Sequence, residues 1–286
     1  MLTRIHGPRA LAATLMAILA LVGLSFAPAA AITNGTSDAG NHPWVGLYTA
    51  HKANGDYQWR CTATLISPTV MVTAGHCTFD SDAGDDVAKA VIFFDQGPII
   101  PDPDFTLTTR SCVGIVGYPC AGGVTGTPYT NPNFDDNAFY LDDVGVVVLD
   151  TPVYLDHYGQ LPTAGQLSLM KPGPRSWFTT VGYWLQKSFP DSAAWKNVSV
   201  RERMVAYPQL NEIDTPATGP FSMWISANAK TGGTCFGDSG GPSFIGGSDV
   251  LAGVTSYGYT STCKGPDGIY RLDNSTDIGW IEGFLE

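Results

Sequence analysis

Charged residues are scarce in this sequence, and several kinds of pattern are missing from it. Only 14% of its 286 residues are charged, and the net charge is −11. The basic residues form no run or stripe, so neither nucleic acid nor an anionic membrane is expected as a partner. The absence of a C-x-x-C pair and of clustered histidines argues against a zinc site. Helical periodicity is confined to the last dozen residues, Ser275 to Glu286.

Glycine and proline, in contrast, are abundant, with 33 and 20 residues. Such a composition favours short strands and turns over long helices. Short apolar or alternating runs occur at residues 44–49, 61–66, 70–73, 91–94, 144–149, 198–207 and 250–257. Ser67-Pro68-Thr69 is expected to turn the second run into the third as a hairpin. The sequence therefore predicts an all-β protein, a sandwich or a barrel, with residues 151–174 as the best candidate for a connection between two halves.

The first 31 residues have the pattern of an export signal. Arg4 and Arg9 precede an apolar stretch from Leu11 to Phe26, and Ala29 and Ala31 offer an A-x-A cleavage site. This predicts a signal peptide at residues 1–31 and a secreted, extracellular mature chain that is not bound to a membrane. An uncleaved anchor is the alternative, but the stretch is shorter than the ~20 residues of a typical span.

Six cysteines follow the predicted leader. An even number in an exported chain indicates disulfides. Many pairings are open to six cysteines, and the simplest scheme joins neighbours along the chain: Cys61–Cys77, Cys112–Cys120 and Cys235–Cys263.

Ser239 lies in the stretch G-G-T-C-F-G-D-S-G-G-P-S-F, residues 232–244. A serine between glycines is ordinarily a turn residue, but G-D-S-G-G also fits the G-x-S-x-G elbow of α/β-hydrolases. That fold needs a histidine after the serine, and none follows Ser239. A catalytic histidine must then come earlier, and His76 in T-A-G-H-C, directly after an apolar run, is the candidate. Asp143, which leads into the run V-G-V-V-V-L, is preferred over Asp142 as the acid.

T-A-G-H-C, D-V-G-V-V-V-L and G-D-S-G-G-P occur in this order along the chain. Together with C-T-A-T-L-I-S, T-S-Y-G (255–258) and G-I-Y-R (268–271), they resemble the motifs of the chymotrypsin/trypsin family of serine peptidases. The resemblance covers residues 32–286. It implies two packed six-stranded antiparallel β-barrels, here expected at residues 32–153 and 154–286, with a short C-terminal helix.

The function that this resemblance implies is that of a serine endopeptidase. Such an enzyme acts on polypeptides, is open to protein inhibitors, needs no cofactor or metal, and is expected to be a monomer. Two alternatives stay open: a catalytically silent binding protein on the same fold, and an esterase that uses the same triad.

The resemblance also assigns roles to individual residues. Ser239 would attack the substrate, His76 would take its proton, and Asp143 would hold the imidazole. Ser256 would hydrogen-bond to Asp143, and the backbone N–H groups of Gly237 and Ser239 would bind the oxyanion. Activity should rise through roughly pH 6.5 to 7 as His76 loses its proton.

In the family, a freed N-terminal isoleucine pairs its ammonium with the acid before the nucleophile, here Asp238. Ile32-Thr33-Asn34-Gly35 stands where the family usually has I-V-G-G. Cleavage after Ala31 would expose Ile32, so export itself would activate the enzyme. Loss of activity at alkaline pH would follow if the Ile32 ammonium deprotonates.

The substrate pocket follows from the same motifs. Trypsin-like members carry an aspartate six residues before the nucleophile, where this chain has Gly233. A buried substrate cation without a carboxylate partner is costly, so we expect cleavage after bulky apolar residues. Tyr257 replaces the family's usual tryptophan, and glycines leave the walls open. The expected pocket residues are Gly233, Thr234, Ser256, Tyr257, Gly258 and Gly268.

Two further patterns carry weaker signals. Asn34, Asn197 and Asn274 each begin a glycosylation sequon, and the first is interpreted as coincidental because an N-terminal turn is expected to be buried. The acidic stretch 80–86 fits no EF-hand spacing, so a solvated turn is preferred over a calcium loop.

Overall fold

The computed structural model describes residues 32–183, 185–187, 193 and 198–285. The expected signal peptide at 1–31 and the sequon at Asn197 therefore lie outside the described residues. The strands are β1 (Thr36–Ser37), β2 (Val45–His51), β3 (Tyr57–Leu65), β4 (Val70–Thr73), β5 (Phe79–Asp80), β6 (Asp85–Asp86), β7 (Lys89–Phe93), β8 (Val124–Thr130), β9 (Gly145–Leu149), β10 (Gly173–Gly182), β11 (Leu185–Lys187), β12 (Val198–Ser199), β13 (Met204–Ala206), β14 (Gln209–Ile213), β15 (Ser222–Ile225), β16 (Pro242–Ile245), β17 (Leu251–Gly258) and β18 (Asp267–Arg271). The helices are α2 (Gly75–Thr78), α3 (Ser275–Glu282) and the 3-10 turns η1 (Asp136–Ala138) and η2 (Leu167–Leu169).

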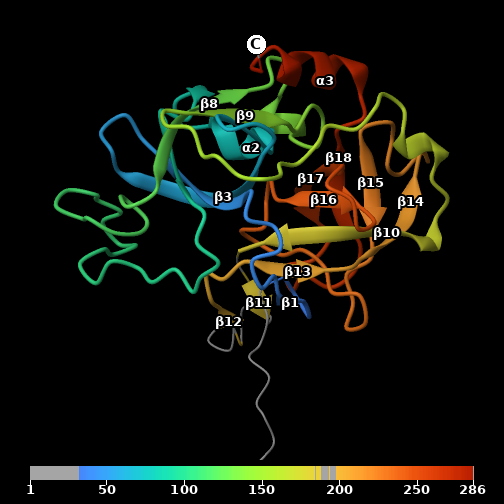
Figure 1. The fold of residues 1–286 in the computed structure, drawn as a ribbon, viewed down its shortest axis with the longest axis horizontal. Coiled ribbons are helices and arrows are strands. Elements are labelled where there is room, and N and C mark those ends of the chain that lie inside the picture. Colours follow the sequence, from blue (N-terminus) through green and yellow to red (C-terminus); the bar gives the residue numbers. More distant parts are fainter. Residues whose placement is uncertain (1–31, 184, 188–192, 194–197, 286) are drawn as a thin grey trace, which may run out of the picture.

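Twelve of these strands form two closed antiparallel barrels of six strands each, which confirms the predicted fold. The first barrel has the order β2-β3-β4-β9-β8-β7. The second runs β10-β14-β15-β18-β17-β16 and closes because β16 pairs back onto β10. Strands β13 and β1 extend the second sheet beyond β10. Figure 1 shows β3, β8 and β9 of the first barrel beside β10 and β14–β18 of the second.

Most of the apolar runs in the sequence became strands, but one did not remain whole. The run 70–73 coincides with β4, and the predicted hairpin at 67–69 joins β3 to β4, with Thr64 opposite Val72. The run 198–207 is split into β12 and β13, and Arg203, which directly precedes β13, is buried.

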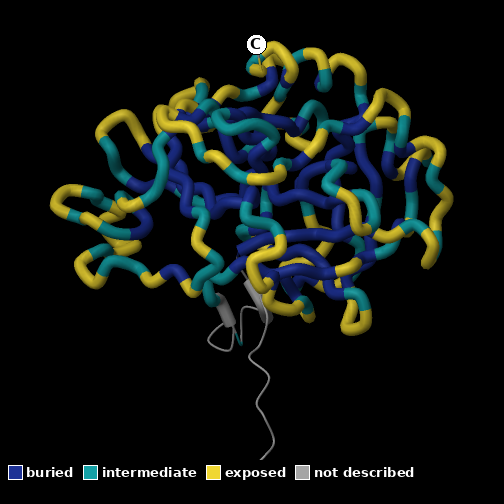
Figure 2. The backbone as a smooth tube through the Cα atoms, in the orientation of Figure 1, coloured by how far each residue is buried: buried dark blue, intermediate teal, exposed yellow. Residues whose placement is uncertain are grey.

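The two barrels share a hydrophobic core. A single cluster of buried side chains contains Leu47 and Val72 of the first barrel together with Phe244 and Val254 of the second. Strand β2 is buried along its whole length, and exposed backbone is concentrated in the loops around the rim (Figure 2). Between β9 and β10, η2 is the only helix and no strand occurs, and the domain boundary expected at residues 153/154 falls in this connection.

Helix α3 ties the C-terminus back to the first barrel. The Asn274 side chain caps its first turn by accepting a hydrogen bond from Thr276 N, 2.9 Å away. Asp277 on this helix accepts from Asn131 Nδ2 at 3.0 Å and from the Tyr270 hydroxyl at 2.7 Å. The predicted C-terminal helix is thus present. None of the helices among the described residues is long and apolar enough to cross a membrane.

Three disulfides form between sequence neighbours: Cys61–Cys77, Cys112–Cys120 and Cys235–Cys263. The first joins β3 to α2, and the third joins the loop before β16 to the loop before β18. Both loops that the third bond joins line the pocket beside Ser239 described below.

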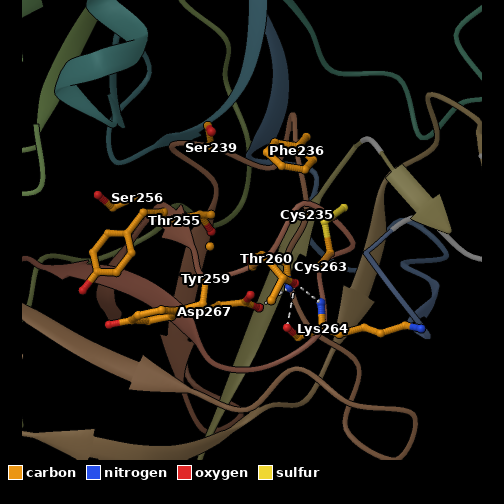
Figure 3. Close-up of a pocket in the computed structure, with 13 residues that line it drawn as sticks. Cys235, Phe236, Ser239, Thr255, Ser256, Tyr259, Thr260, Cys263, Lys264 and Asp267 are labelled. Carbon is orange, nitrogen blue, oxygen red and sulfur yellow. Dashed lines mark hydrogen bonds between the residues drawn. A yellow bond between two sulfur atoms is a disulfide. The ribbon is translucent and has the colours of Figure 1, made fainter. Parts of the chain in front are cut away.

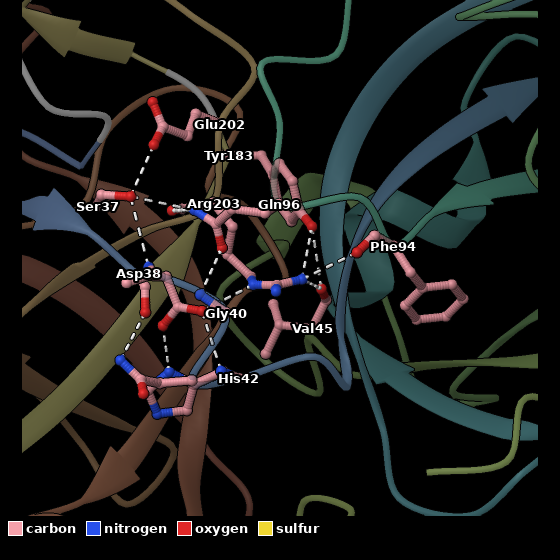
Figure 4. A network of polar contacts seen from close by, with 12 residues as sticks. Ser37, Asp38, Gly40, His42, Val45, Phe94, Gln96, Tyr183, Glu202 and Arg203 are labelled. Atoms are coloured by element: carbon pink, nitrogen blue, oxygen red, sulfur yellow. Dashed lines mark hydrogen bonds and ion pairs between the residues drawn. The ribbon is translucent and has the colours of Figure 1, made fainter.

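Arg203 forms a buried polar junction between the barrels (Figure 4). Its side chain is 2% exposed, and its Nε donates to Asp38 Oδ2 at 2.9 Å. Its Nη1 donates to the carbonyls of Val45 and Phe94, both at 3.1 Å, and to the Tyr183 hydroxyl at 3.0 Å. Since two of these acceptors belong to or adjoin first-barrel strands, the guanidinium fixes the N-terminal segment and both barrels at one point.

We predict that Arg203→Met lowers the free energy of unfolding by about 3–5 kcal/mol, because it leaves the Asp38 carboxylate buried without its guanidinium. Urea unfolding with the disulfides intact measures the change. Arg175→Met, at an exposed position on β10, is the matched control and should cost less than about 0.5 kcal/mol. Equal stability of the two variants would contradict the prediction.

Candidate active site

His76 lies on the short helix α2, which begins two residues after strand β4 ends. Its imidazole Nδ1 is 3.0 Å from Asp143 Oδ2 and 3.1 Å from Asp143 Oδ1. The His76 backbone N–H also donates to Asp143 Oδ1, at 2.9 Å. The carboxylate therefore fixes both the backbone and the ring of the histidine, and leaves Nε2 as the ring nitrogen directed away from it.

Asp143 is fully buried, and it receives donors from both barrels. Besides the contacts from His76, the Ser256 hydroxyl on β17 donates to its Oδ2 at 2.5 Å. Asp142 adopts a left-handed conformation with φ of 53°, and the chain enters β9 two residues after Asp143. Asp143, rather than Asp142, is thus the buried aspartate that contacts the imidazole of His76.

The pKa of His76 is raised above its ordinary value of 6.5. Burial lowers this pKa, but the charge and hydrogen bond of Asp143, with a smaller contribution from Asp136, outweigh the effect of burial. The arrangement consequently stabilises an imidazolium, which is the form a general base takes once it has accepted a proton.

Ser239 lies on a loop that is hydrogen-bonded to both barrels. Its carbonyl accepts from Thr62 N on β3 at 2.8 Å, and the next residue, Gly240, donates to Thr255 O on β17 at 2.8 Å. Thr62 follows Cys61, whose disulfide partner Cys77 follows His76. These links hold the loop beside the histidine, although no hydrogen bond joins the Ser239 hydroxyl to His76 among the described residues.

The backbone around Ser239 also offers N–H groups as hydrogen-bond donors. Gly237 has φ of 91°, in the left-handed region that glycine tolerates best. Its carbonyl accepts from the Thr62 hydroxyl at 3.3 Å. In the part of the chain that the structure describes, neither Gly237 N–H nor Ser239 N–H donates to a protein acceptor. Two free donors next to a serine are what an oxyanion site requires.

A pocket opens beside Ser239 (Figure 3). The Cys235–Cys263 disulfide joins two of its walls. The Tyr257 ring covers Gly268 so closely that a Cβ there would lie 2.3 Å from the ring. The lining residues are Thr234, Cys235, Phe236, Ser239, Thr255, Ser256, Tyr257, Gly258, Tyr259, Thr260, Cys263, Lys264 and Asp267. Four of the six expected pocket residues, Thr234, Ser256, Tyr257 and Gly258, are among them. Gly233 and Gly268 do not line the pocket but adjoin the lining residues Asp267 and Tyr257.

Asp267 is the pocket residue that the sequence analysis missed. It is 3% exposed, and its Oδ2 accepts from Thr234 N at 2.6 Å. Burial raises the pKa of its carboxyl to about 8, against the hydrogen bonds from Thr234. The expectation of a pocket without a carboxylate is therefore wrong. The available signal was its position immediately before the G-I-Y-R motif, on the strand that forms the pocket's far wall.

The N-terminal segment packs next to the same loop. The Ile32 side chain is fully buried against Met204 and Ala206. Thr33 and Gly233 form an antiparallel bridge, with Gly233 N donating to Thr33 O at 3.1 Å. Asp238, fully buried, accepts from the backbone N–H of Cys235 at 2.9 Å.

Residue 31 lies outside the described residues, so the ion pair expected between Ile32 and Asp238 stays a prediction. The interpretation of the Asn34 sequon needs correction, because this side chain is exposed rather than buried. Its φ of 58° lies in the left-handed region, which asparagine tolerates better than most residues.

The described residues offer one group with metal-ligand spacing, Cys61, His76 and Cys77. Both sulfurs are joined in a disulfide, so neither can act as a thiolate ligand. In the acidic stretch 80–86, Asp80 accepts from Gln58 Nε2 at 2.6 Å and Asp86 accepts from Thr130 N at 2.9 Å. These carboxylates stabilise the β5–β6 turn.

A second hollow adjoins the pocket and shares Tyr257 and Tyr259 with it. Phe139, Tyr140 and Leu141 form one side, and residues 216–222 form another. The Phe139 ring lies 6.3 Å from the His76 ring, centroid to centroid. An extended chain that crosses the site would therefore meet an aromatic surface next to the histidine.

A family model described as trypsin matches residues 122–277, more than half of the chain, and the protein belongs to the trypsin family. The match includes Asp143 and Ser239 but begins after His76. The chain is 28% identical over 274 residues to the Spaetzle-processing enzyme of Drosophila melanogaster, covering 85% of this chain but only 63% of that protein. It is 29% identical over 246 residues to trypsin of Saccharopolyspora erythraea, covering 80% and 87% of the two chains.

Solved structures share the fold at lower identity. HL collagenase superposes with a TM-score of 0.63 at 18% identity, covering 89% of this chain and 98% of the other. Human heparin binding protein superposes with a TM-score of 0.59 at 20% identity, covering 89% and 96%.

We predict that the His76 imidazole titrates above pH 6.5 and that Asp143→Asn lowers its pKa, because the variant removes the negative charge beside Nδ1. Proton NMR of the ring resonances across pH 5 to 9 measures both values. His157, an exposed histidine, is the internal control, and its ring resonances should coincide in the two proteins. A His76 pKa that is unchanged in the variant would contradict the electrostatic role of Asp143.

Proposed function

We propose that this protein is a secreted serine endopeptidase that cleaves polypeptides through Ser239, His76 and Asp143. The observation that supports this most directly is the buried Asp143 carboxylate, which His76 and Ser256 contact from opposite barrels beside the pocket lined by Ser239. Membership of the trypsin family agrees with this chemistry. Export is supported by the pattern of residues 1–31.

In the proposed reaction the Ser239 oxygen attacks the carbonyl carbon of the substrate, and its proton passes to His76 Nε2. Asp143 stabilises the resulting imidazolium and keeps its Nδ1 proton in place. The backbone N–H groups of Gly237 and Ser239 bind the negative oxygen of the tetrahedral intermediate. His76 then protonates the leaving amine as the C–N bond breaks, and a water molecule, deprotonated by His76, hydrolyses the acyl-enzyme.

The preference for bulky apolar residues does not carry over to this proposal. It depended on Gly233 leaving the pocket uncharged, whereas Asp267 brings a carboxylate to the same place. The aromatic hollow formed by Phe139, Tyr140 and Tyr259 suits apolar side chains elsewhere along the bound polypeptide.

A binding protein without catalysis and an esterase are the alternatives. The fold alone does not decide, since one structural neighbour is named a heparin binding protein. The hydrogen-bonded His76–Asp143–Ser256 arrangement favours an enzyme, because a binding surface has no need of a buried carboxylate that orients a partly exposed imidazole.

We expect a fluorophosphonate probe to label Ser239, and Ser239→Ala to abolish both labelling and peptide hydrolysis. Asp143→Asn should lower kcat by about 10⁴, the loss that this change causes in related triads. Ser248→Ala, at an exposed serine on the turn between β16 and β17, is the control and should keep full activity. If the probe labels Ser239 but no peptide amide is hydrolysed, the result contradicts the peptidase and supports the esterase. If the folded protein is not labelled, the result supports the binding protein.

We also expect the secreted protein to begin at Ile32, so that its ammonium can pair with the buried Asp238. N-terminal sequencing checks the first residue, and the activity of Asp238→Asn checks the pairing. This activity should fall at least about tenfold, because a buried ammonium then lacks its counter-charge. Full activity of a chain that begins at Ala30 or earlier would refute activation by export.

A further inference from the structure

The pocket beside Ser239 contains a buried carboxylate that the proposed reaction does not use. We propose that Asp267 makes this pocket select a basic side chain, the ammonium of lysine or the guanidinium of arginine, on the residue whose carbonyl Ser239 attacks. This inference rests on the proposed function and adds the substrate class.

Asp267 fills the place where an acid at position 233 would otherwise lie. A Cβ on Gly233 would be 2.3 Å from the Ala227 Cβ and 2.9 Å from Asp267 Oδ2. The floor of the pocket therefore has room for one carboxylate, and β18 supplies it from the opposite wall. Asp267 is opposite Ile225 on β15 and opposite Gly258 on β17, so its backbone is held within the sheet on both sides.

In the part of the chain that the structure describes, no cation neutralises this carboxylate. Among the described residues, Asp267 takes part in no ion pair, and its hydrogen bonds come from Thr234. Lys264 also lines the pocket, but Figure 3 shows its side chain extending away from Asp267. Arg271, on the same strand, is engaged by Asp214 and Asp273. A substrate cation would provide the missing counter-charge.

The other titratable groups around Asp267 also favour a positively charged ligand beside it. The charge of the buried Asp238 acts on Asp267 and disfavours a second negative charge nearby. Tyr257 and Tyr259, on and after β17, carry no cationic group and supply no positive charge. In the empty pocket these surroundings keep a proton on Asp267 up to about pH 8. Binding of a substrate cation should then release that proton.

The pocket walls suit the remainder of a basic side chain. The Tyr257 ring lies over Gly268, and its hydroxyl accepts from Trp224 Nε1 at 3.1 Å, which fixes the ring. The exposed Phe236 lines the same pocket. Apolar and aromatic surface along the sides with a charged group at the end matches the methylene stem and charged head of lysine or arginine.

The first test compares peptide amides that differ only in the residue before the scissile bond. At pH 8.5 we expect kcat/KM for arginine or lysine to exceed that for phenylalanine or leucine by at least about tenfold. The preference should grow from pH 7 to 9, because ionised Asp267 is the form that binds a cation and its pKa lies near 8. Faster cleavage after phenylalanine or leucine throughout this range would overturn the proposal, and so would a preference for glutamine that matches arginine.

The second test uses Asp267→Asn. This variant should lose at least about 100-fold in kcat/KM for arginyl and lysyl substrates, since a desolvated charge pair is removed, and should lose far less on the phenylalanyl substrate, so that the ratio of the two activities changes. Asp249→Asn, a partly buried acid outside the pocket, is the matched control and should leave both activities unchanged. Equal losses on basic and apolar substrates would overturn the proposal.

Folding and the triad are monitored separately by fluorophosphonate labelling of Ser239. If Asp267→Asn is not labelled, the test moves to the wild-type protein and two inhibitors, benzamidine and neutral benzamide. At pH 9, benzamidine should bind at least about tenfold more tightly than benzamide. Benzamidine itself should bind about 100-fold more weakly at pH 6 than at pH 9, as expected when binding requires loss of a proton from a group with a pKa of about 8. Equal binding of the two compounds would refute the role of Asp267, whereas failure of the wild-type protein to be labelled would refute the triad instead.

Discussion

The carboxylate of Asp143 is the contact on which the rest of the site depends. It is fully buried, and a buried carboxylate is tolerated only when hydrogen bonds replace the water it has lost. Those bonds come from His76 on the first barrel and from Ser256 on the second. The orientation of the imidazole and the docking of the two barrels are therefore stabilised by the same group, and neither can change without disturbing the other.

Two buried aspartates of the site, Asp143 and Asp267, show how similar side chains acquire different roles. Asp143 is met by an imidazole, a backbone N–H and a hydroxyl. Asp267 is met by Thr234 alone, with the charge of Asp238 nearby, and its pKa rises accordingly. A buried carboxylate that receives several hydrogen bonds from the protein orients the groups that donate them. A carboxylate that receives fewer hydrogen bonds and faces an open pocket is suited to bind a ligand.

Much of the fold and of the candidate site could be predicted from the sequence, because those signals are local. Apolar runs such as 70–73 mark strands directly, and the sequences around His76, Asp143 and Ser239 are compact motifs. Strands rich in polar residues and proline, such as β8 and β10, have no such periodic signal and were not predicted.

What the sequence could not supply are contacts between distant segments. Arg203 belongs to an alternating run that looks like one strand, and only the position of Asp38, 165 residues earlier, explains why it turns inward. Asp267 and Gly233 are 34 positions apart. The sequence motif showed that Gly233 carries no acid, but it did not show that the Asp267 carboxylate occupies the same place.

The N-terminal segment, the pocket and the oxyanion donors form one continuous piece of structure. Thr33 pairs with Gly233 at the start of the loop that carries Thr234, Gly237 and Ser239. Thr234 in turn holds Asp267 through its backbone N–H. Because each contact fixes backbone that the next one uses, disorder in residues 32–35 would loosen the floor of the pocket and the oxyanion donors together. Substrate selection and catalysis in this chain thus depend on the same docked N-terminal segment.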